Sequence, residues 1–385
     1  MPQNLLLTGG RAPVTLSLAR MFHAAGWTIF VAESMPRHLC RVSRAVQKNY
    51  HVPAPRFNPT SYIQALKQII EQANISLLIP TCEEIFYIAQ GLPRLTSTGC
   101  QLFVEPIERL RSLHNKWLFN QLAQQYGLSV PKSVYVTSRS ALIEQIHHRP
   151  DSVIKPVFSR FGTAVFVRPQ PDNLPNLTIS SDYPWLVQQY IEGQAICTYS
   201  LAHQGRLTAH SCYRSELSVQ GGATVMFQPL DHSATYQWVD TFVRKYGFTG
   251  QIAFDFIETV DKELFALECN PRATNGALLF TGQPNLPDAF VDPTMPCLHV
   301  TRQRPLMVML AMLLMVLPDM LGSQSARSRW WRLFRRAEGV IYNRHDPWPF
   351  WFQPVSMLDF IHWSIRHGIS LRQASTFDIE WNGTK

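Results

Sequence analysis

The chain has 385 residues, enough for two or three domains with a substantial buried core, and its hydrophobic (46%) and charged (16%) fractions exclude wholesale disorder. Its net charge of +8 suits nucleic acid, anionic substrates such as nucleotides, or a membrane surface, but the sequence contains no nucleic-acid-binding motif. Seven scattered cysteines without a C-x-x-C pair argue against a disulfide or zinc framework and favour a reducing compartment.

The amino-terminal segment predicts an α/β domain. No basic stretch precedes a long apolar run, so we expect no secretory signal and a cytoplasmic location. Residues 4–8 predict a strand, apolar positions at helical spacing over 16–25 predict a helix, and 28–32 predict a second strand. An NAD site is the alternative for this β-α-β start. It would use Gly9, Gly10 and Glu33, but Arg11-Ala12-Pro13 replaces the remaining glycines of the dinucleotide fingerprint.

Further elements extend this domain to about residue 103. We expect a strand over 49–52, a helix over 61–73 and a buried strand over 76–80. Glu83 and Glu84 follow that last strand, at the edge where open α/β sheets bind ligands, so either carboxylate could touch a substrate. Acids in the first turn of a helix also stabilise its amino terminus, and we favour that plainer interpretation.

The middle of the chain predicts a small subdomain that covers phosphate groups. Residues 105–127 are expected to form one helix that carries Lys116. A strand over 152–155, the loop 159–163 and a strand over 164–168 then make a strand-loop-strand unit. The backbone N–H groups of such a loop can approach phosphate oxygens.

The next segments run from another strand to a helix. Residues 185–193 predict a strand, and two further strands are expected over 196–201 and 207–214, before a helix over 233–246. An arginine fork suits a carboxylate or a phosphate, so we predict that Arg214 reaches a substrate carboxylate or the terminal phosphate of a nucleotide.

Residues 251–259 and 264–270 predict a hairpin around Asp261-Lys262. If these two residues form the loop, Asp255 lies opposite Glu268, and Asn270 shares their face. The other face then carries the core side chains of Phe254, Phe256, Leu267 and Cys269. Two carboxylates and an amide oxygen on one face suit a hard cation, because Mg²⁺ takes one or two carboxylates together with phosphate oxygens.

The last hundred residues contain two notable segments. The twelve apolar residues 306–317 would span about 18 Å as a helix, which is too short for a bilayer. In residues 327–337, Trp330, Leu333, Phe334 and Ala337 share one helical face and five arginines line the remainder. This helix either docks on the body or lies on a membrane surface. The aromatic-rich remainder should be folded, but no chemistry follows from it.

The run Glu268-Cys269-Asn270-Pro271-Arg272 resembles the E-x-N-P-R motif of the ATP-grasp superfamily, especially its carbamoyl-phosphate-synthetase-like branch. The motif and the N-terminal domain are also similar to the ATP-grasp ligases that form mycosporine-glycine. The resemblance implies that Asp255, Glu268 and Asn270 hold Mg²⁺, or Mn²⁺ in its place. It further implies that ATP is the nucleotide and that Arg272 meets its phosphates.

The resemblance also implies the nucleotide-binding residues. Lys116 and Lys155 resemble the two conserved lysines of the superfamily. The strand that starts at Trp185 resembles the hinge, whose backbone at Gln189 and Ile191 would bind adenine. Two departures are clear: Gln188 stands where Glu is common, and Ala195 stands where relatives often place a ribose-binding acid. The covering loop has few glycines, and its predicted contacts are Ser159, Arg160 and Gly162.

The resemblance implies an α/β and α+β multidomain protein. A Rossmann-like pre-ATP-grasp domain (1–103) would precede a two-part ATP-grasp domain (104–290, with a lid over about 128–187) and a mostly helical C-terminal extension (291–385). The implied activity is ligation: ATP phosphorylates a carboxylate or enol-like acceptor, and an amine displaces the phosphate. Small acid and amine substrates, a homodimer and peripheral membrane contact through 327–337 complete this interpretation. A non-catalytic ATP-binding or membrane-associated scaffold is the alternative, which the hinge departures favour and the intact Asp–Glu–Asn set opposes.

Overall fold

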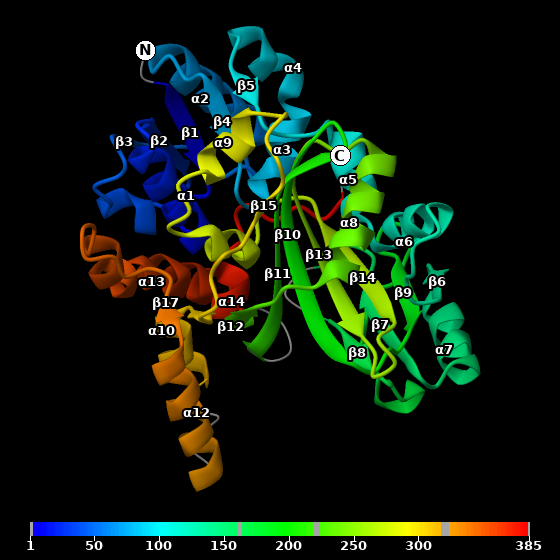
Figure 1. Ribbon diagram of the computed structural model, residues 1–385. Coiled ribbons are helices and arrows are strands. Elements are labelled where there is room, and N and C mark those ends of the chain that lie inside the picture. The colour runs from blue at the N-terminus through cyan, green and yellow to red at the C-terminus, as the bar shows by residue number, and fades with distance from the viewer. Residues whose placement is uncertain (1–2, 160–163, 219–223, 317–322, 384–385) are drawn as a thin grey trace.

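The protein is described from a computed structural model whose placed residues are 3–159, 164–218, 224–316 and 323–383. Three β-sheets organise it, and helices join and cover them (Figure 1). A parallel sheet is built by the N-terminal residues, a large mostly antiparallel sheet fills the centre, and a small antiparallel sheet lies at the far side of the large one. Helices follow in the C-terminal region. The predicted fold class, mixed α/β and α+β, is confirmed.

The N-terminal sheet is a parallel, doubly wound sheet, as the β-α-β start predicts. Its strand order is β3-β2-β1-β4-β5. Leu5 and Leu7 on β1 enter one buried cluster and Leu6 enters another, so the continuous apolar run reflects burial on both faces. The strands are β1 (Asn4–Thr8), β2 (Thr28–Glu33), β3 (Lys48–His51), β4 (Leu77–Ile79) and β5 (Gln101–Leu102). The helical segments are α1 (Pro13–Ala24), η1 (Leu39–Val42), α2 (Pro59–Gln72), α3 (Glu84–Gln90), α4 (Leu92–Leu95) and η2 (Thr96–Thr98).

The predicted single helix over 105–127 is wrong. The structure has α5 (Ile107–His114) and α6 (Lys116–Gln125), separated at Asn115. Asn115 adopts an extended conformation, and its side-chain oxygen accepts hydrogen bonds from the backbone N–H groups of Trp117 and Leu118. Asn115 is therefore the N-cap of α6, and this cap places Lys116 at the first position of a new helix.

The small sheet has the strand order β6-β9-β7-β8. Its strands are β6 (Ser133–Val136), β7 (Ser152–Pro156), β8 (Phe166–Val167) and β9 (Trp185–Gln189), with α7 (Arg139–His148) and η3 (Pro171–Asn173) beside them. Strand β8 is shorter than the predicted strand over 164–168, and the loop 160–163 lies outside the described residues. The two strands of the strand-loop-strand unit predicted from 152–168 are thus β7 and β8, which pair with each other.

The large sheet has the strand order β14-β13-β10-β11-β12-β16-β17, and β15 pairs with β11. Helix α8 (Ser233–Tyr246), found at its predicted bounds, covers one face, where Trp238 and Phe242 contact Phe254. The opposite face packs against η4 (Asn275–Phe280) and α9 (Leu286–Val291), which lie beside α1 of the N-terminal sheet. Its strands are β10 (Gln194–His203), β11 (Arg206–Ser218), β12 (Thr224–Pro229), β13 (Gly250–Glu258), β14 (Leu264–Asn270), β15 (Leu298–His299), β16 (Leu306–Met307) and β17 (Glu338–Gly339).

The described part of the apolar run, residues 306–316, changes conformation several times. It begins as β16 and continues as α10 (Met309–Ala311) and the π-helical turn η5 (Met312–Val316). Within the placed segments of the chain, no helix is both long and apolar enough to cross a membrane.

The arginine-rich segment forms α12 (Gln324–Arg336), which projects from the body (Figure 1). Its apolar face is covered by the chain itself, because Trp330 is buried in a cluster with Met307 and Met312, and Leu333 and Phe334 pack against it. The helix is therefore docked on the chain, which was one of the two interpretations of its amphipathic pattern.

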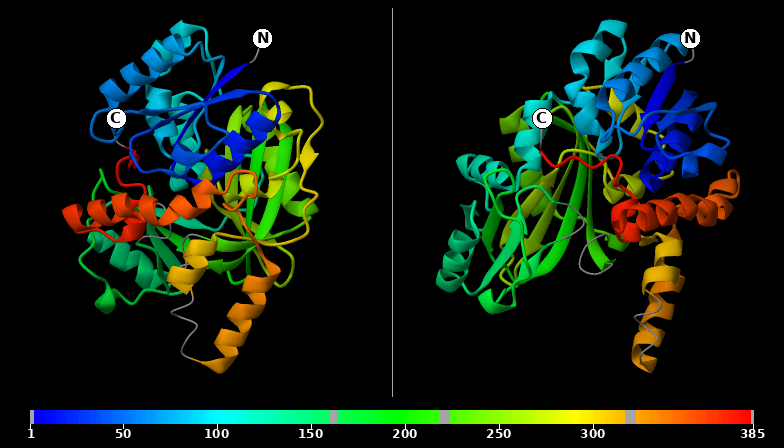
Figure 2. Two further views of the ribbon diagram at one scale, coloured as in Figure 1. Left: turned by 90° about the vertical axis from the view of Figure 1, so that its left-hand side faces the viewer. Right: turned by 180° about the vertical axis from the view of Figure 1, so that it is seen from behind.

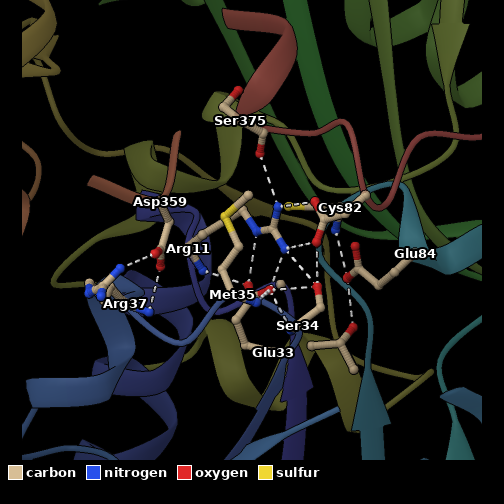
Figure 3. A network of polar contacts seen from close by, with 12 residues as sticks. Arg11, Glu33, Ser34, Met35, Arg37, Cys82, Glu84, Asp359 and Ser375 are labelled. Atoms are coloured by element: carbon tan, nitrogen blue, oxygen red, sulfur yellow. Dashed lines mark hydrogen bonds and ion pairs between the residues drawn. The ribbon is translucent and has the colours of Figure 1, made fainter. Parts of the chain in front are cut away.

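The C-terminal residues return to the N-terminal sheet. Helix α13 (Trp348–His367) and α14 (Leu371–Ala374) lie beside this sheet, and the tail after them runs between it and the rest of the molecule (Figure 2). Arg11, which follows β1, joins the two regions (Figure 3). Its guanidinium pairs with Glu33 at the end of β2 and with Asp378 of the tail, and Nη1 also donates to the Ser375 carbonyl at 3.2 Å. The carboxylate of Glu33, the acid that an NAD site would need, thus forms an ion pair with Arg11.

We predict that the Arg11–Glu33 pair contributes to stability in a pH-dependent way. Burial alone would raise the pKa of Glu33, but the Arg11 guanidinium lowers it to about 2. The variant Glu33→Gln should lower the free energy of unfolding at pH 7 by about 3 kcal/mol, since each pKa unit corresponds to about 1.4 kcal/mol. A depressed carboxyl pKa stabilises the fold above the unfolded-state value of about 4.3.

The difference between wild type and variant should therefore shrink as the pH falls from about 4.3 to 2, where Glu33 is protonated in the unfolded state and half protonated in the folded state. Urea unfolding at a series of pH values measures it. Glu144→Gln, at a side chain that is 66% exposed, is the control and should behave as wild type. A gap that stays constant down to pH 2 would contradict the prediction.

Candidate functional site

The hairpin of β13 and β14 pairs Asp255 with Glu268, as predicted. The predicted two-residue loop is wrong, however. Thr259 N–H donates to the Glu263 carbonyl, so the loop has three residues, and Lys262 takes the positive φ (67°) that such a loop requires. A β-bulge compensates for the longer loop, because the register shifts between Asp255 and Phe256.

The bulge also corrects the predicted core face of the hairpin. Phe254, Phe256 and Cys269 are buried as expected, but Leu267 is only partly buried, and Leu264 and Ala266 take its place in the core. Leu267 is the extra residue of β14, between the paired residues Ala266 and Glu268. Its carbonyl accepts a hydrogen bond from Lys155 at 3.4 Å, so the irregularity supplies a contact to a lysine of the site.

A row of polar side chains crosses four adjacent strands of the large sheet. Tyr213, Cys197, Asp255 and Glu268 are consecutive cross-strand partners on β11, β10, β13 and β14, so they share one face. Burial raises the pKa of Asp255 to about 7, and the neighbouring charge of Glu268 acts in the same direction. Burial would also raise the pKa of Glu268, but Lys116 and Lys155 lower it to about 2. The row therefore holds one firmly ionised carboxylate beside a second that titrates near neutrality.

Asn270 and Arg272 extend this acidic group. The Asn270 side-chain amide lies 3.3 Å from Asp255 Oδ2, and Arg272 Nη2 lies 3.3 Å from Asn270 Oδ1. Arg272 Nη2 also lies 3.7 Å from Glu83 Oε1 of the N-terminal region. Within the described part of the chain, the buried Nε–H of Arg272 has no acceptor, so the guanidinium keeps a donor for a ligand anion.

Two buried lysines face Glu268 from other elements. Lys116 Nζ lies 3.3 Å from Glu268 Oε2 and donates to the Ser159 carbonyl at 2.8 Å. Burial lowers the pKa of Lys155 to about 8; Glu268 opposes this effect, and Lys116 adds to it. The end of β7, the start of α6 and the hairpin thus bring together Lys116, Lys155, Ser159, Asp255, Glu268, Asn270 and Arg272, all predicted from sequence.

The predicted hinge lies on β9 and just beyond it. Gln188, where an acid was expected, is buried and donates from its side chain to Ser133 Oγ at 3.1 Å. The backbone N–H of Gln189 already donates to the Lys132 carbonyl at 2.8 Å, and Ile191 follows the strand. Arg160 and Gly162 of the covering loop lie outside the described residues.

The predicted role of Arg214 is contradicted by the sheet register. Arg214 pairs with Ile196, which pairs with Phe256, so these three residues form the row next to Asp255. Side chains alternate along strands, so this row faces the side of the sheet that α8 covers, opposite to the acidic row. The structure does not bring Arg214 to Asp255 and Glu268.

Sequence reasoning missed two neighbours of the site. Cys197 is partly buried beside Asp255, and the register of β10 with β13 was the signal that would have found it. Glu83 was assigned a plain helix-capping role, but it makes no cap hydrogen bond and contacts Arg272 instead. Glu84 does have a local structural role, because its Oε1 accepts hydrogen bonds from Thr8 Oγ1 and from the N–H groups of Thr81 and Cys82.

The fold and these side chains define a protein with a cationic, phosphate-compatible site beside an acidic hairpin. Residues 113–276 match the family model of the ATP-grasp domain. This segment of the chain is therefore an ATP-grasp domain. No curated protein matches the chain in sequence.

Several solved structures share this fold at low identity. N5-carboxyaminoimidazole synthetase from Staphylococcus aureus is 12% identical with a TM-score of 0.65, over 84% of this chain and 87% of that one. L-amino acid ligase from Bacillus licheniformis is 15% identical with a TM-score of 0.56, over 70% and 67%. The biotin carboxylase domain of 2-oxoglutarate carboxylase from Hydrogenobacter thermophilus, a dimer with MgADP and bicarbonate, is 11% identical with a TM-score of 0.57, over 70% and 64%.

The donor set suits a divalent cation that is shared with a nucleotide. Asp255, Glu268 and Asn270 offer only oxygen ligands of the hard type, and they lie on one face of the hairpin. Among the described residues, no cluster of three or more acidic, histidine or cysteine side chains could enclose a metal by itself. Magnesium commonly needs no such cage, because phosphate oxygens and water complete its shell.

We predict that Lys155 takes up a proton when the nucleotide binds. With a pKa near 8, Lys155 is about half neutral at pH 8, and a bound phosphate favours its charged form. Calorimetric titration of Mg-ATP at pH 8, in two buffers of different ionisation enthalpy, should show uptake of about half a proton. Affinity should weaken as the pH rises above 8. Lys155→Arg stays charged, so it should lack this uptake; equal uptake by both proteins would refute the assignment.

Proposed function

We propose that this protein is an ATP-dependent ligase that activates a carboxylate, or an enol-like acceptor, and joins it to an amine. The observation that supports the proposal is the group formed by Asp255 and Glu268 with Asn270, Arg272 and the two buried lysines inside an ATP-grasp domain. ADP and inorganic phosphate would be the other products. The neighbours' names denote a synthetase, an amino acid ligase and a carboxylase domain, which agrees with this class of reaction.

Each part of the group has a role in phosphoryl transfer. The γ-phosphoryl carries spread negative charge in the transition state, so catalysis depends on positioning and on neutralising that charge. Asp255, Glu268 and Asn270 would hold Mg²⁺, which neutralises phosphate oxygens when bound. Lys116, Lys155 and the free donor of Arg272 would meet phosphate oxygens directly.

The proposed order of events follows from the acceptor chemistry. An acceptor oxygen attacks the γ-phosphorus, ADP leaves, and the resulting acyl phosphate is open to attack by an amine. The amine nitrogen forms the new bond to carbon as the carbon–oxygen bond to phosphate breaks, and the departing phosphate takes up the proton that the amine loses. Arg272 lies at the junction of the acidic row and Glu83, where it can bind the transferred phosphoryl group. The residues need only bind and orient the reactants for this sequence.

The nucleotide would lie between the small sheet and the hairpin. The backbone at the end of β9 and just beyond it, at Gln189 and Ile191, would bind adenine through groups other than the Gln189 N–H, and Ser159 with the covering loop would approach the phosphates. Gln188 is committed to Ser133, so it would stabilise the strand and would not contact the base directly. Arg160 and Gly162 belong to the same proposal, as predicted loop contacts.

The test is magnesium- and ATP-dependent phosphate release with pooled amino acids and small carboxylic acids. We expect release to require a pool member and to fall at least 100-fold in Glu268→Gln, because one ionised metal ligand is lost. Glu263→Gln is the matched control: it lies in the same hairpin, is exposed and is distant from the acidic row. Nucleotide binding without release in every pool would favour the scaffold alternative, and release that persists in Glu268→Gln would refute the assigned metal site.

We also propose that the outward side of α12 contacts a membrane that contains acidic lipids. Arg329, Arg332 and Arg335 are exposed, and Trp331 between them is 49% exposed. The helix projects from the body, so this side is presented to the surroundings (Figure 1). Arginine and tryptophan are the residue types that favour a lipid interface.

The membrane proposal predicts selective binding to anionic vesicles. Replacing Arg329, Arg332 and Arg335 by Gln should weaken co-sedimentation about 100-fold, at about 1 kcal/mol for each charge. Vesicles of neutral phosphatidylcholine provide the control. Equal binding of wild type and variant to anionic vesicles would contradict the proposal.

A further inference from the structure

The C-terminal tail, residues 375–383, crosses the molecule at the functional site. It follows α14 and runs between the N-terminal sheet and the ATP-grasp region (Figure 2). These residues lie outside the segment that matches the ATP-grasp family model, and the sequence carries no recognisable motif there. Their contacts nevertheless reach two parts of the proposed active site.

The tail is firmly attached to the N-terminal sheet. Both carboxylate oxygens of the buried Asp378 accept from Arg11, at 2.6 and 2.9 Å, and Ser34 Oγ donates to the same carboxylate at 2.6 Å. Arg56 adds a backbone hydrogen bond to the Asp378 carbonyl and a side-chain hydrogen bond to Glu380. Because Asp378 is only 1% exposed, the tail is part of the folded body rather than a surface segment.

Beyond this attachment, Trp381 enters an aromatic cluster with Phe86, His114 and Phe158. Its ring stacks on Phe86 of α3 at 4.6 Å and 12°, and it meets the edge of Phe158 at 5.7 Å and 85°. His114 lies 6.2 Å away and also contacts Phe86 and Phe158. Trp381 is 3% exposed, so its ring is buried within the cluster.

The partners of Trp381 are directly connected to Lys116. Phe158 precedes Ser159, whose carbonyl accepts the hydrogen bond from Lys116 Nζ. His114 is the last residue of α5, and only the N-cap Asn115 separates it from Lys116. A shift of the Trp381 ring would therefore displace both chain segments that orient Lys116.

A second connection leads from Trp381 to Arg272. The backbone N–H of Trp381 lies 3.4 Å from Glu83 Oε2, and Glu83 Oε1 faces Arg272 Nη2 at 3.7 Å. Glu83 is 3% exposed, so its charge acts on Arg272 with little screening by solvent. One tail residue thus touches the supports of both a lysine and the arginine of the site.

We propose that Trp381 is a positioning residue of the active site: its ring holds Phe158 and His114 against Lys116, and its backbone holds Glu83 against Arg272. The inference rests on the proposed function and deepens it, because it makes the C-terminal tail a working part of the ligase site. Trp381 touches neither nucleotide nor acceptor. It acts by limiting the motion of groups that do.

The test compares variants of the full-length protein for Mg-ATP affinity, kcat and KM, and thermal unfolding. Trp381→Ala should raise the Kd for Mg-ATP and lower kcat, each by at least 10-fold, when measured well below its Tm. Trp381→Phe keeps an aromatic ring and the backbone N–H, so it should stay within about 3-fold of wild type. Glu380→Gln, a tail variant at a partly exposed pair with Arg56, is the matched control and should retain wild-type values.

Two further variants keep the test decisive if Trp381→Ala does not fold. Glu83→Gln should lower kcat at least 10-fold with little change in nucleotide Kd, since it acts through Arg272 alone. Gly383→Ala should raise the Kd, because Gly383 has a φ of +81° and an added Cβ would come within 2.4 Å of the Phe158 ring. That variant disturbs Phe158 without creating a cavity at Trp381.

The outcomes separate this inference from the proposed ligase reaction. If Trp381→Ala and Gly383→Ala lose only Tm and keep wild-type Kd and kcat, the tail is merely structural and the inference is overturned. If the wild-type protein releases no phosphate in any pool, the ligase proposal fails. The nucleotide affinities, which need no turnover, then still decide whether the tail positions the lysine.

Discussion

The structure depends on placing two carboxylates, Asp255 and Glu268, side by side on a partly buried face of one hairpin. Like charges this close repel each other, and burial disfavours both ionised forms. Two buried lysines and an arginine, at three other positions of the chain, offset this repulsion. Glu268 thus keeps its negative charge beside Lys116 and Lys155, while Asp255 titrates near neutrality. Such a charge-balanced group is suited to a cation and phosphate oxygens.

This requirement explains several features that would otherwise be irregularities. The helix break at Asn115 places Lys116 at a helix start, where its Nζ reaches Glu268. The bulge at Leu267 restores the Asp255–Glu268 pair after a three-residue loop and directs a carbonyl to Lys155. Both are local departures from regular structure, and both position a lysine beside Glu268 or its strand.

The C-terminal region is integrated with the N-terminal sheet by burial and charge. Arg11 joins Glu33 of the sheet to Asp378 of the tail, and the tail then continues to Trp381, which contacts Phe158. A tail held in this way makes the two ends of the chain interdependent. The edge of the N-terminal sheet, where comparable sheets often hold a dinucleotide, is filled here by the chain's own side chains.

The sequence by itself determined the parallel N-terminal sheet, the hairpin with Asp255 opposite Glu268, the two lysines and the ATP-grasp motif. These follow from periodicity, from local pairing and from a short motif, all of which are encoded within a few residues of one another. Only the tertiary structure decided that Arg214 faces α8, that Glu83 meets Arg272 and that Trp381 packs against Phe158 and His114. Those outcomes depend on strand register and on packing between segments hundreds of residues apart, for which one sequence carries no direct signal.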